Sequence, residues 1–270
     1  MAGRVITKNL SEEWTIRKRK FQGHPTGSVD IARITGNASL SGKSSRVLKD
    51  EEIIPSIQSR LRHNILVMPP VIREATGFLI FGRRIKSLVF TTDLAIIKNC
   101  DADAVFAVYP FTPQQSISDA IIRAAAVPVF TGIGGGLTKG LRTVTLAKDA
   151  ESQGAYGVVL NAPTSNRYLK AVSAAIDIPV VITVTSEKTD VRDRLRYGAS
   201  IINVAAGERT PDIVMKIDSK YPDIPIIASG GNTEESIRAT IQAGANAITY
   251  TPPSTKELFS EVMERYRETF

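Results

Sequence analysis

Two glycine-rich stretches of the sequence could hold an anion with their backbone. The stretch "TGIGGGLTKG" (131–140) has five glycines in ten residues directly after an apolar run, and "SGGN" (229–232) follows another such run. Glycine adopts positive φ and lets a ligand approach the backbone, and amides at the start of a helix favour negative charge. The predicted ligand contacts in these stretches are Gly134, Gly135, Ser229, Gly230, Gly231 and Asn232.

Side chains that exchange protons or bind metals readily are scarce. The chain has two histidines, His24 and His63, and one cysteine, Cys100. Because no His and Asp residues gather at predicted strand ends, we predict no metal site. A Schiff-base lysine is not expected either, since Lys139 and Lys188 lie past the ends of their strands.

Three polar residues at the ends of predicted strands remain as candidates for proton transfer or orientation: Asp93, Asn161 and Glu208. Asp93 ends the first predicted barrel strand and is the best candidate for a general base. The alternative is that Asp93 N-caps the following helix. Glu208 has the same two interpretations, because a carboxylate at a helix start is also favoured by the helix dipole.

The elements that must position these residues alternate between strand and helix from about residue 85 onward. Runs rich in β-branched residues, each ending in turn residues, predict eight strands. The predicted strands are 85–93, 103–111, 127–135, 156–163, 178–186, 200–207, 224–231 and 246–253. The segments between them begin with Ser, Thr or Asn, as helix capping requires. Strands this uniformly apolar are buried on both faces, which requires parallel strands covered by helices.

Eight such units predict an α/β fold, a (β/α)8 TIM barrel over residues 85–270. An open doubly wound sheet is the alternative, but the unbroken, short-linked series favours closure. Residues 1–84 do not share the repeat and form a basic N-terminal extension, with its densest positive charge at 16–20. Residues 77–90 indicate a hairpin that leads from the extension into the barrel. The extension could plug the barrel, make an oligomer contact or cover the mouth.

The stretch "IPIIASGGNTEESIRATIQAGANAITY" (224–250) resembles the seventh and eighth units of the phosphate-binding TIM-barrel superfamily. That superfamily includes thiazole synthase, the tryptophan and histidine biosynthetic barrels, and FMN-dependent barrels. The shared features are a strand ending in Ser-Gly-Gly (229–231) and a helix carrying Ala-Gly-Ala (243–245). The resemblance implies phosphate contacts from Gly230, Gly231 and Asn232.

The end of the eighth strand departs from the superfamily pattern. It reads "TYTPPS", where Pro252 and Pro253 have no N–H to donate to an anion. Only Thr251 and Ser254 remain there as contacts, so Thr251 joins the predicted ligand residues and half of the usual phosphate cradle is missing.

Three functions remain open on the sequence. The first is a metabolic enzyme of lyase, synthase or isomerase type that acts on a small anionic, phosphorylated carbonyl compound at the mouth of the barrel. The second is an FMN-dependent oxidoreductase. The third is a non-catalytic regulatory barrel, or one that binds nucleic acid through residues 16–20.

Composition adds expectations about where the protein works. A single cysteine fits a reducing compartment, and the sequence has neither a secretory signal nor an apolar run long enough to span a membrane. We therefore expect a cytoplasmic protein without membrane contact, and we expect a homo-oligomer.

Overall fold

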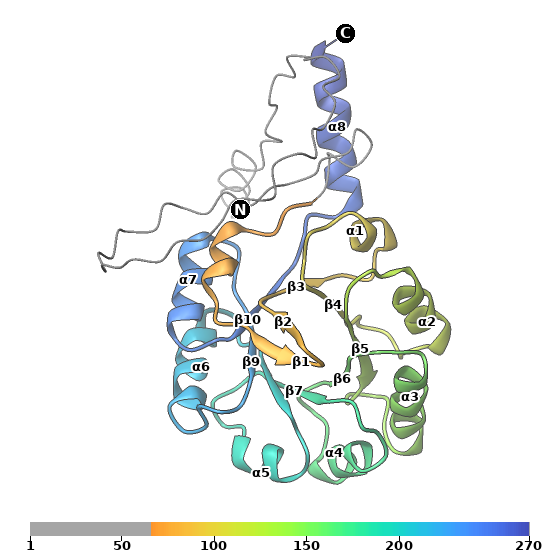
Figure 1. The fold of residues 1–270 in the computed structure, drawn as a ribbon, viewed down its shortest axis with the longest axis vertical. Coiled ribbons are helices and arrows are strands. Elements are labelled where there is room, and N and C mark those ends of the chain that lie inside the picture. The colour runs from red at the N-terminus through yellow and green to blue at the C-terminus, as the bar shows by residue number, and fades with distance from the viewer. Residues whose placement is uncertain (1–65, 270) are drawn as a thin grey trace, which may run out of the picture. The chain divides into compact units, whose positions relative to one another are not determined.

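Eight parallel strands close into a barrel, as predicted. The computed structural model describes residues 66–269, which belong to a compact unit extending from Ile65 to Phe270, and Figure 1 shows the fold. The strands are β3 (Ser87–Phe90), β4 (Ala104–Ala107), β5 (Val129–Gly134), β6 (Gly157–Leu160), β7 (Val180–Val184), β8 (Ile201–Val204), β9 (Ile226–Ser229) and β10 (Ala247–Tyr250). They pair in chain order, and β10 pairs with β3 to close the barrel. The open doubly wound sheet is excluded.

Helices follow the strands and surround the barrel (Figure 1). They are α1 (Leu94–Lys98), α2 (Gln115–Ala124), α3 (Leu141–Ser152), α4 (Asn166–Ser173), α5 (Val191–Arg196), α6 (Thr210–Asp218), α7 (Glu234–Gln242) and α8 (Thr255–Thr269), with 3-10 turns η1 (Pro70–Glu74) and η2 (Gly207–Arg209). Only some begin as the sequence predicts: Thr233 N-caps α7 and Ser254 N-caps α8, whereas Asp residues cap α1 and α5, and Ser165 before α4 makes no capping bond.

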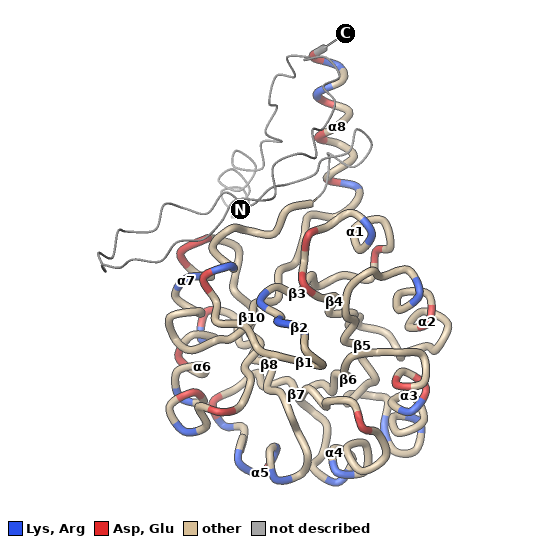
Figure 2. Tube along the Cα trace, in the orientation of Figure 1, with Lys and Arg blue, Asp and Glu red and all other residues tan. Residues whose placement is uncertain are grey.

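The barrel strands are apolar because both of their faces are buried. None of the eight contains a charged residue, and in Figure 2 the charges lie on the helices, the loops and β2. The side chains that point inward form an apolar core with Leu88, Phe106 and Phe130 among its members. No strand therefore presents a lysine or carboxylate to the barrel interior.

A hairpin closes the amino-terminal end of the barrel. Its strands, β1 (Phe78–Ile80) and β2 (Arg83–Ile85), pair antiparallel directly before β3. Phe78, Ile80 and Ile85 are buried in the same cluster as the inward-pointing barrel residues, and the rings of Phe78 and Phe130 meet edge to face at 6.4 Å. With this end filled, a ligand can approach only from the carboxyl ends of the strands.

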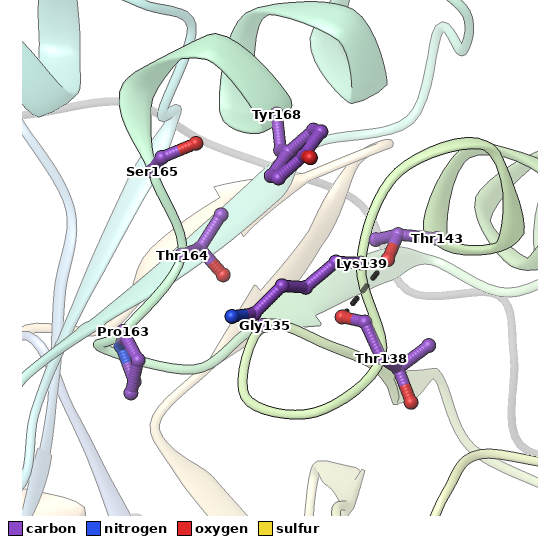
Figure 3. Close-up of a pocket in the computed structure, with 8 residues that line it drawn as sticks. All are labelled: Gly135, Thr138, Lys139, Thr143, Pro163, Thr164, Ser165 and Tyr168. Atoms are coloured by element: carbon purple, nitrogen blue, oxygen red, sulfur yellow. Dashed lines mark hydrogen bonds between the residues drawn. The ribbon is translucent and has the colours of Figure 1, made fainter.

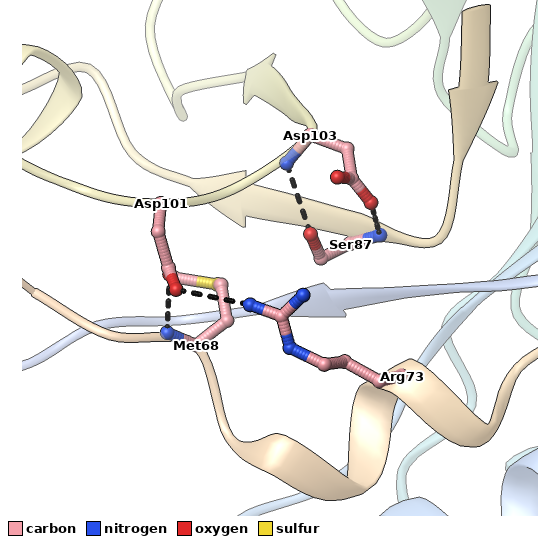
Figure 4. A network of polar contacts seen from close by, with 5 residues as sticks. All are labelled: Met68, Arg73, Ser87, Asp101 and Asp103. Atoms are coloured by element: carbon pink, nitrogen blue, oxygen red, sulfur yellow. Dashed lines mark hydrogen bonds and ion pairs between the residues drawn. The ribbon is translucent and has the colours of Figure 1, made fainter. Parts of the chain in front are cut away.

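Two aspartates fasten the segments at the closed end (Figure 4). Asp103 accepts hydrogen bonds at 2.9 Å from the backbone of Lys86 and Ser87, and the Ser87 hydroxyl accepts one from the Asp103 amide. Asp101 accepts a bond from the Met68 amide at 2.6 Å and pairs with Arg73. These carboxylates hold backbone in place and lie far from the open mouth.

Some expectations fall outside the part that the structure describes. The basic stretch 16–20, and with it the predicted nucleic-acid contact, lies there, as do both histidines. Within residues 66–269, no helix is both long and apolar enough to cross a membrane. The homo-oligomer and the cytoplasmic location stay predictions.

Candidate functional site

The last inward-facing layer before the open mouth is polar on five neighbouring strands. Side chains alternate along a strand, so the residue two positions after an inward-pointing core residue also points inward. On β7 to β10, and directly after the last residue of β6, these residues are Asn161, Thr183, Asn203, Ser229 and Thr249. The sequence predicted Asn161 and Ser229 as site residues, whereas Thr183, Asn203 and Thr249 were not among the predicted site residues.

Hydrogen bonds join this polar layer in pairs. Asn203 Nδ2 donates to Thr183 Oγ1 at 3.2 Å, and Thr249 Oγ1 lies 3.3 Å from the Ala228 carbonyl and 3.4 Å from Ser229 Oγ. Asn203 is only 5% exposed, and its Oδ1 has no partner among the described residues. Leaving a buried acceptor unpaired costs about 1–3 kcal/mol. A ligand N–H or O–H that reached Asn203 would remove this cost.

The opposite wall of the mouth is aromatic. Phe90 and Phe106 are register partners on β3 and β4, and their ring centroids lie 6.1 Å apart. Phe90 is 36% exposed at the rim. The mouth therefore combines an apolar wall with a polar wall, which is typical of sites for small organic ligands.

Asp93 is the N-cap of α1. Its Oδ1 accepts bonds from the amides of Ala95 at 2.8 Å and Ile96 at 3.3 Å, and its Oδ2 accepts one from the Thr255 hydroxyl at the start of α8. The Thr255 hydroxyl is the main cause that holds the pKa of Asp93 below its ordinary value, with the two amides adding to it. Both oxygens are thus engaged, and the capping role that sequence left open is the one seen.

Glu208 lies in η2, directly after β8, the strand that carries Asn203. Its side chain is exposed, and η2 leads into α6. Asn161 follows β6, and its backbone N–H donates to the Gly134 carbonyl at 2.9 Å. Of the three predicted catalytic residues, Asn161 joins the polar layer, Glu208 sits at the rim, and Asp93 lies on the side of β3. Their catalytic roles stay predictions.

The β9–α7 turn contains the predicted phosphate residues. A Cβ on Gly230 would lie 2.8 Å from both Ile237 and Ile248, so packing of α7 against the sheet requires glycine there. Gly231 has a φ of +80°. The start of α7 is already occupied, because Thr233 and Ser236 form a reciprocal capping box. Asn232 and Thr251 are exposed.

The β5–α3 glycine loop packs against the start of α4. Between them lies a hollow of about 80 Å³, shown in Figure 3. Gly135 lines it, and Gly134 just before it has a φ of +116°. The other lining residues are Thr138, Lys139, Thr143, Pro163, Thr164, Ser165 and Tyr168.

A wider open groove of about 590 Å³ runs along the other side of the β6–α4 loop, with Lys188, Asp190 and Arg194 among its lining residues. Arg194 holds that loop: Nη1 bonds to the Thr164 carbonyl and to Asn166 Oδ1 at 2.8 Å, and Nη2 bonds to the Ala162 carbonyl at 3.0 Å. Burial lowers the pKa of the Arg194 guanidinium from its ordinary value. These bonds fix the shape of the loop between the two hollows.

Sequence reasoning missed Thr164. The segment "NAPTSN" (161–166) suggested a strand end followed by a capped helix, so its hydroxyls counted as caps. The available signal was the absence of an acidic residue in the first turn of α4, which leaves the helix start without negative charge.

The described residues offer no cluster of metal ligands: within residues 66–269, no three His, Cys, Asp or Glu side chains gather as a metal site would need.

Comparison with known proteins supports the fold. No protein-family model and no curated protein matches the sequence. Among solved structures, phosphonopyruvate hydrolase aligns over 73% of this chain and 85% of that chain, with a TM-score of 0.55 and 16% identity. 2,3-Dimethylmalate lyase, a PEP mutase/isocitrate lyase superfamily member, aligns over 74% and 84%, with a TM-score of 0.53 and 10% identity.

A third similar structure is mandelate oxidase, solved as a mutant with benzaldehyde, which aligns over 66% of this chain and 68% of that chain at a TM-score of 0.52 and 16% identity. Identities this low show a shared fold and nothing finer. The similar structures share the barrel fold with this chain, and the predicted phosphate-binding TIM barrel is compatible with them at that level. It does not show the superfamily of thiazole synthase.

Proposed function

We propose that this protein is an enzyme of lyase or isomerase type that acts on a small anionic carbonyl compound at the carboxyl end of its barrel. The observation that carries the proposal is Asn203, a residue of the polar layer whose buried amide oxygen has no donor among the described residues. A purely structural residue in a barrel core is normally apolar or fully hydrogen-bonded. An unpaired amide at the mouth instead fits a group that a ligand completes.

The polar layer suits chemistry at a carbonyl group. When a bond next to a carbonyl breaks, negative charge develops on the carbonyl oxygen, and hydroxyl and amide donors fixed around it stabilise that charge. Asn161 and Ser229 supply such donors, while Asn203 Oδ1 accepts a hydrogen bond from a hydroxyl of the substrate or its enol. Because this layer has no charged side chain, it orients the substrate and does not itself take up the proton.

Glu208 is the proposed proton acceptor. A general base must reach the substrate and must have a free oxygen. Asp93 has both oxygens engaged, whereas Glu208 is exposed and follows the strand that carries Asn203. This role requires η2 to bring the carboxylate of Glu208 over the mouth.

Names of similar structures fit this substrate class. Phosphonopyruvate hydrolase and 2,3-dimethylmalate lyase are named for small carboxylate compounds, and the former has been solved with oxalate and Mg²⁺. In the described part of this chain, no side chains are grouped to hold a metal ion. No step is therefore assigned to a metal.

The FMN alternative is less well supported by the β9–α7 turn. Glu234 and Glu235 occupy the first turn of α7, and their charges oppose a phosphate group at that helix start. A yellow purified protein would nevertheless favour the flavin enzyme.

A screen for α-proton exchange tests the proposed function. The full-length protein is incubated in D₂O with a panel of small 2-oxo and 2-hydroxy acids and their phosphorylated forms, and NMR follows deuterium incorporation and bond cleavage. Catalysed exchange or cleavage with one member, lost in a Glu208→Gln variant, is expected. No catalysis with any member of the panel would contradict the proposal.

A further inference from the structure

The hollow between the glycine loop and α4 has the size of a small oxyanion. Its volume is about 80 Å³, and one water takes up about 30 Å³ in the liquid. A phosphate or carboxylate group fits such a space. Figure 3 shows the hollow bounded by Lys139 and Gly135 on one side and by Thr164, Ser165 and Tyr168 on the other.

A buried hydroxyl points into this hollow without a partner. Thr164 is only 3% exposed, and its Oγ1 has no hydrogen bond with any described residue. In Figure 3 this oxygen points toward the amine of Lys139. Because burial removes the hydration of the hydroxyl, a ligand that accepts its proton would restore the lost bond.

The start of α4 borders the hollow through Ser165 and Tyr168 and has backbone amides without acceptors in the helix. Ser165 makes no capping bond with its side chain, and the first turn contains no acidic residue. The first amides of a helix have no acceptor within the helix, so those of Asn166 and Arg167 are free to bind a ligand. The positive end of the helix dipole favours an anion at this point.

Lys139 supplies the countercharge. Its side chain is exposed on the glycine loop, lines the hollow and belongs to none of the ion pairs within residues 66–269. The start of α7 differs from the start of α4, because it has a complete capping box and two glutamates in its first turn.

We propose that this hollow binds an oxyanion, either a phosphate or a carboxylate group. Thr164 Oγ1 and the first amides of α4 donate hydrogen bonds to it, and the Lys139 ammonium balances its charge. The inference rests on the proposed function in assigning this oxyanion to the substrate. It moves the main anion contact from the β9–α7 turn to the glycine loop and α4.

Calorimetric titration of the full-length protein with inorganic phosphate, and separately with oxalate, tests this site. The decisive variant is Thr164→Val, which keeps the shape of the side chain and removes the hydroxyl. We expect phosphate affinity to fall about tenfold, as for loss of a hydrogen bond to a charged group. Without phosphate, the melting temperature should stay or rise, because the variant no longer buries an unpaired hydroxyl.

Thr240→Val is the matched control. Thr240 is 1% exposed, but its hydroxyl donates to the Ser236 carbonyl at 2.8 Å. This variant should lower the melting temperature and leave phosphate affinity unchanged, which is the reverse of the Thr164→Val result. Only a ligand-binding hydroxyl gives that opposite pair of effects.

A second pair of variants tests the charge. Lys139→Met should weaken phosphate binding about fivefold at low salt and less at high salt, since the ammonium is exposed and screened. Lys148→Met, which removes an exposed lysine on α3, should leave the affinity unchanged. Stronger binding of phosphate than of oxalate would identify a phosphorylated substrate, and the reverse order would identify a carboxylate.

Absence of both phosphate and oxalate binding in the wild-type protein, or unchanged affinity in Thr164→Val, would overturn the inference. The proposed function has a separate outcome. Oxyanion binding without turnover of any oxo or hydroxy acid would contradict the proposed function but support the oxyanion site. Turnover, together with an unchanged phosphate affinity in Thr164→Val, would support the proposed function but contradict the site.

Discussion

The hydroxyl oxygen of Thr164 lies 2.1 Å from the position that a Cβ on Gly135 would occupy. The glycine loop and the β6–α4 loop can therefore meet only because residue 135 has no side chain. Gly135 also has a φ of +114°, which side chains rarely allow. This contact sets the width of the hollow at the start of α4.

A double-mutant cycle tests that contact. We expect Gly135→Ala to lower the free energy of unfolding by about 2–4 kcal/mol, from overpacking and the positive φ. In a Thr164→Ala background the clash with the hydroxyl is gone, so the same change should cost less. Denaturant unfolding of the four proteins measures the coupling. Equal costs in both backgrounds would show that the two residues do not touch.

The Asp93 cap makes stability depend on acid. Since its folded pKa lies below the ordinary value of 3.8, Asp93 contributes stability above that pH, which is lost as the pH falls through the folded pKa. Asp93→Ala should cost about 1 kcal/mol at pH 7, as for loss of an N-cap. The difference in the free energy of unfolding between Asp93→Ala and wild type should shrink in strong acid. A pH-independent difference would rule out the cap as its source.

Thr255→Val separates the two roles of the Asp93 carboxylate. It removes the hydroxyl that does most to lower the pKa of Asp93 but leaves the bonds to Ala95 and Ile96. NMR titration should show a higher pKa for Asp93 in this variant. An unchanged value would mean that the link from α1 to α8 does not form in solution.

Arg194 should support the β6–α4 loop through geometry as well as charge. Its guanidinium bonds to two carbonyls and one amide oxygen, a pattern that a lysine cannot reproduce. Both Arg194→Lys and Arg194→Met are expected to lower stability, by about 1.5–3 kcal/mol. Thermal unfolding gives the comparison, with exposed Arg192→Lys as the control. Full rescue by lysine would show that only the charge matters.

Tyr250 should reveal its burial at alkaline pH. Desolvation raises its pKa from 10.0 to about 12. The stability from keeping Tyr250 neutral is fully present below pH 10 and is lost as the pH rises toward 12. Tyr250→Phe should therefore flatten the alkaline loss of stability, as measured by unfolding at a series of pH values. An identical slope in both proteins would count against a buried phenol.

The barrel could be predicted from sequence because its strands are buried on both faces. Runs such as 178–186 and 224–231 have no charge and many β-branched residues, and turn residues separate them, so number and order of strands follow directly. The Asp93 cap was one of two readings that the sequence allowed. In both cases the deciding interactions are local in the chain.

The site was harder to predict because it depends on register and on contacts between distant segments. Thr249 was missed since a short apolar strand does not show which of Thr249 and Tyr250 points inward. Thr164 was taken for part of a helix cap. Its burial becomes apparent only when the glycine loop, about 30 residues earlier in the chain, packs over it.

The most direct test of the central claim is the α-proton exchange rate of the substrate found in the screen, compared between wild type and Asn203→Leu. The leucine keeps the size of the side chain; it removes the unpaired oxygen and also the bond to Thr183, two effects on stability that offset each other, so the fold should survive. We predict that exchange falls at least about a hundredfold, as for loss of a preorganised polar contact, while melting temperature does not drop. Exchange at the wild-type rate would contradict the account.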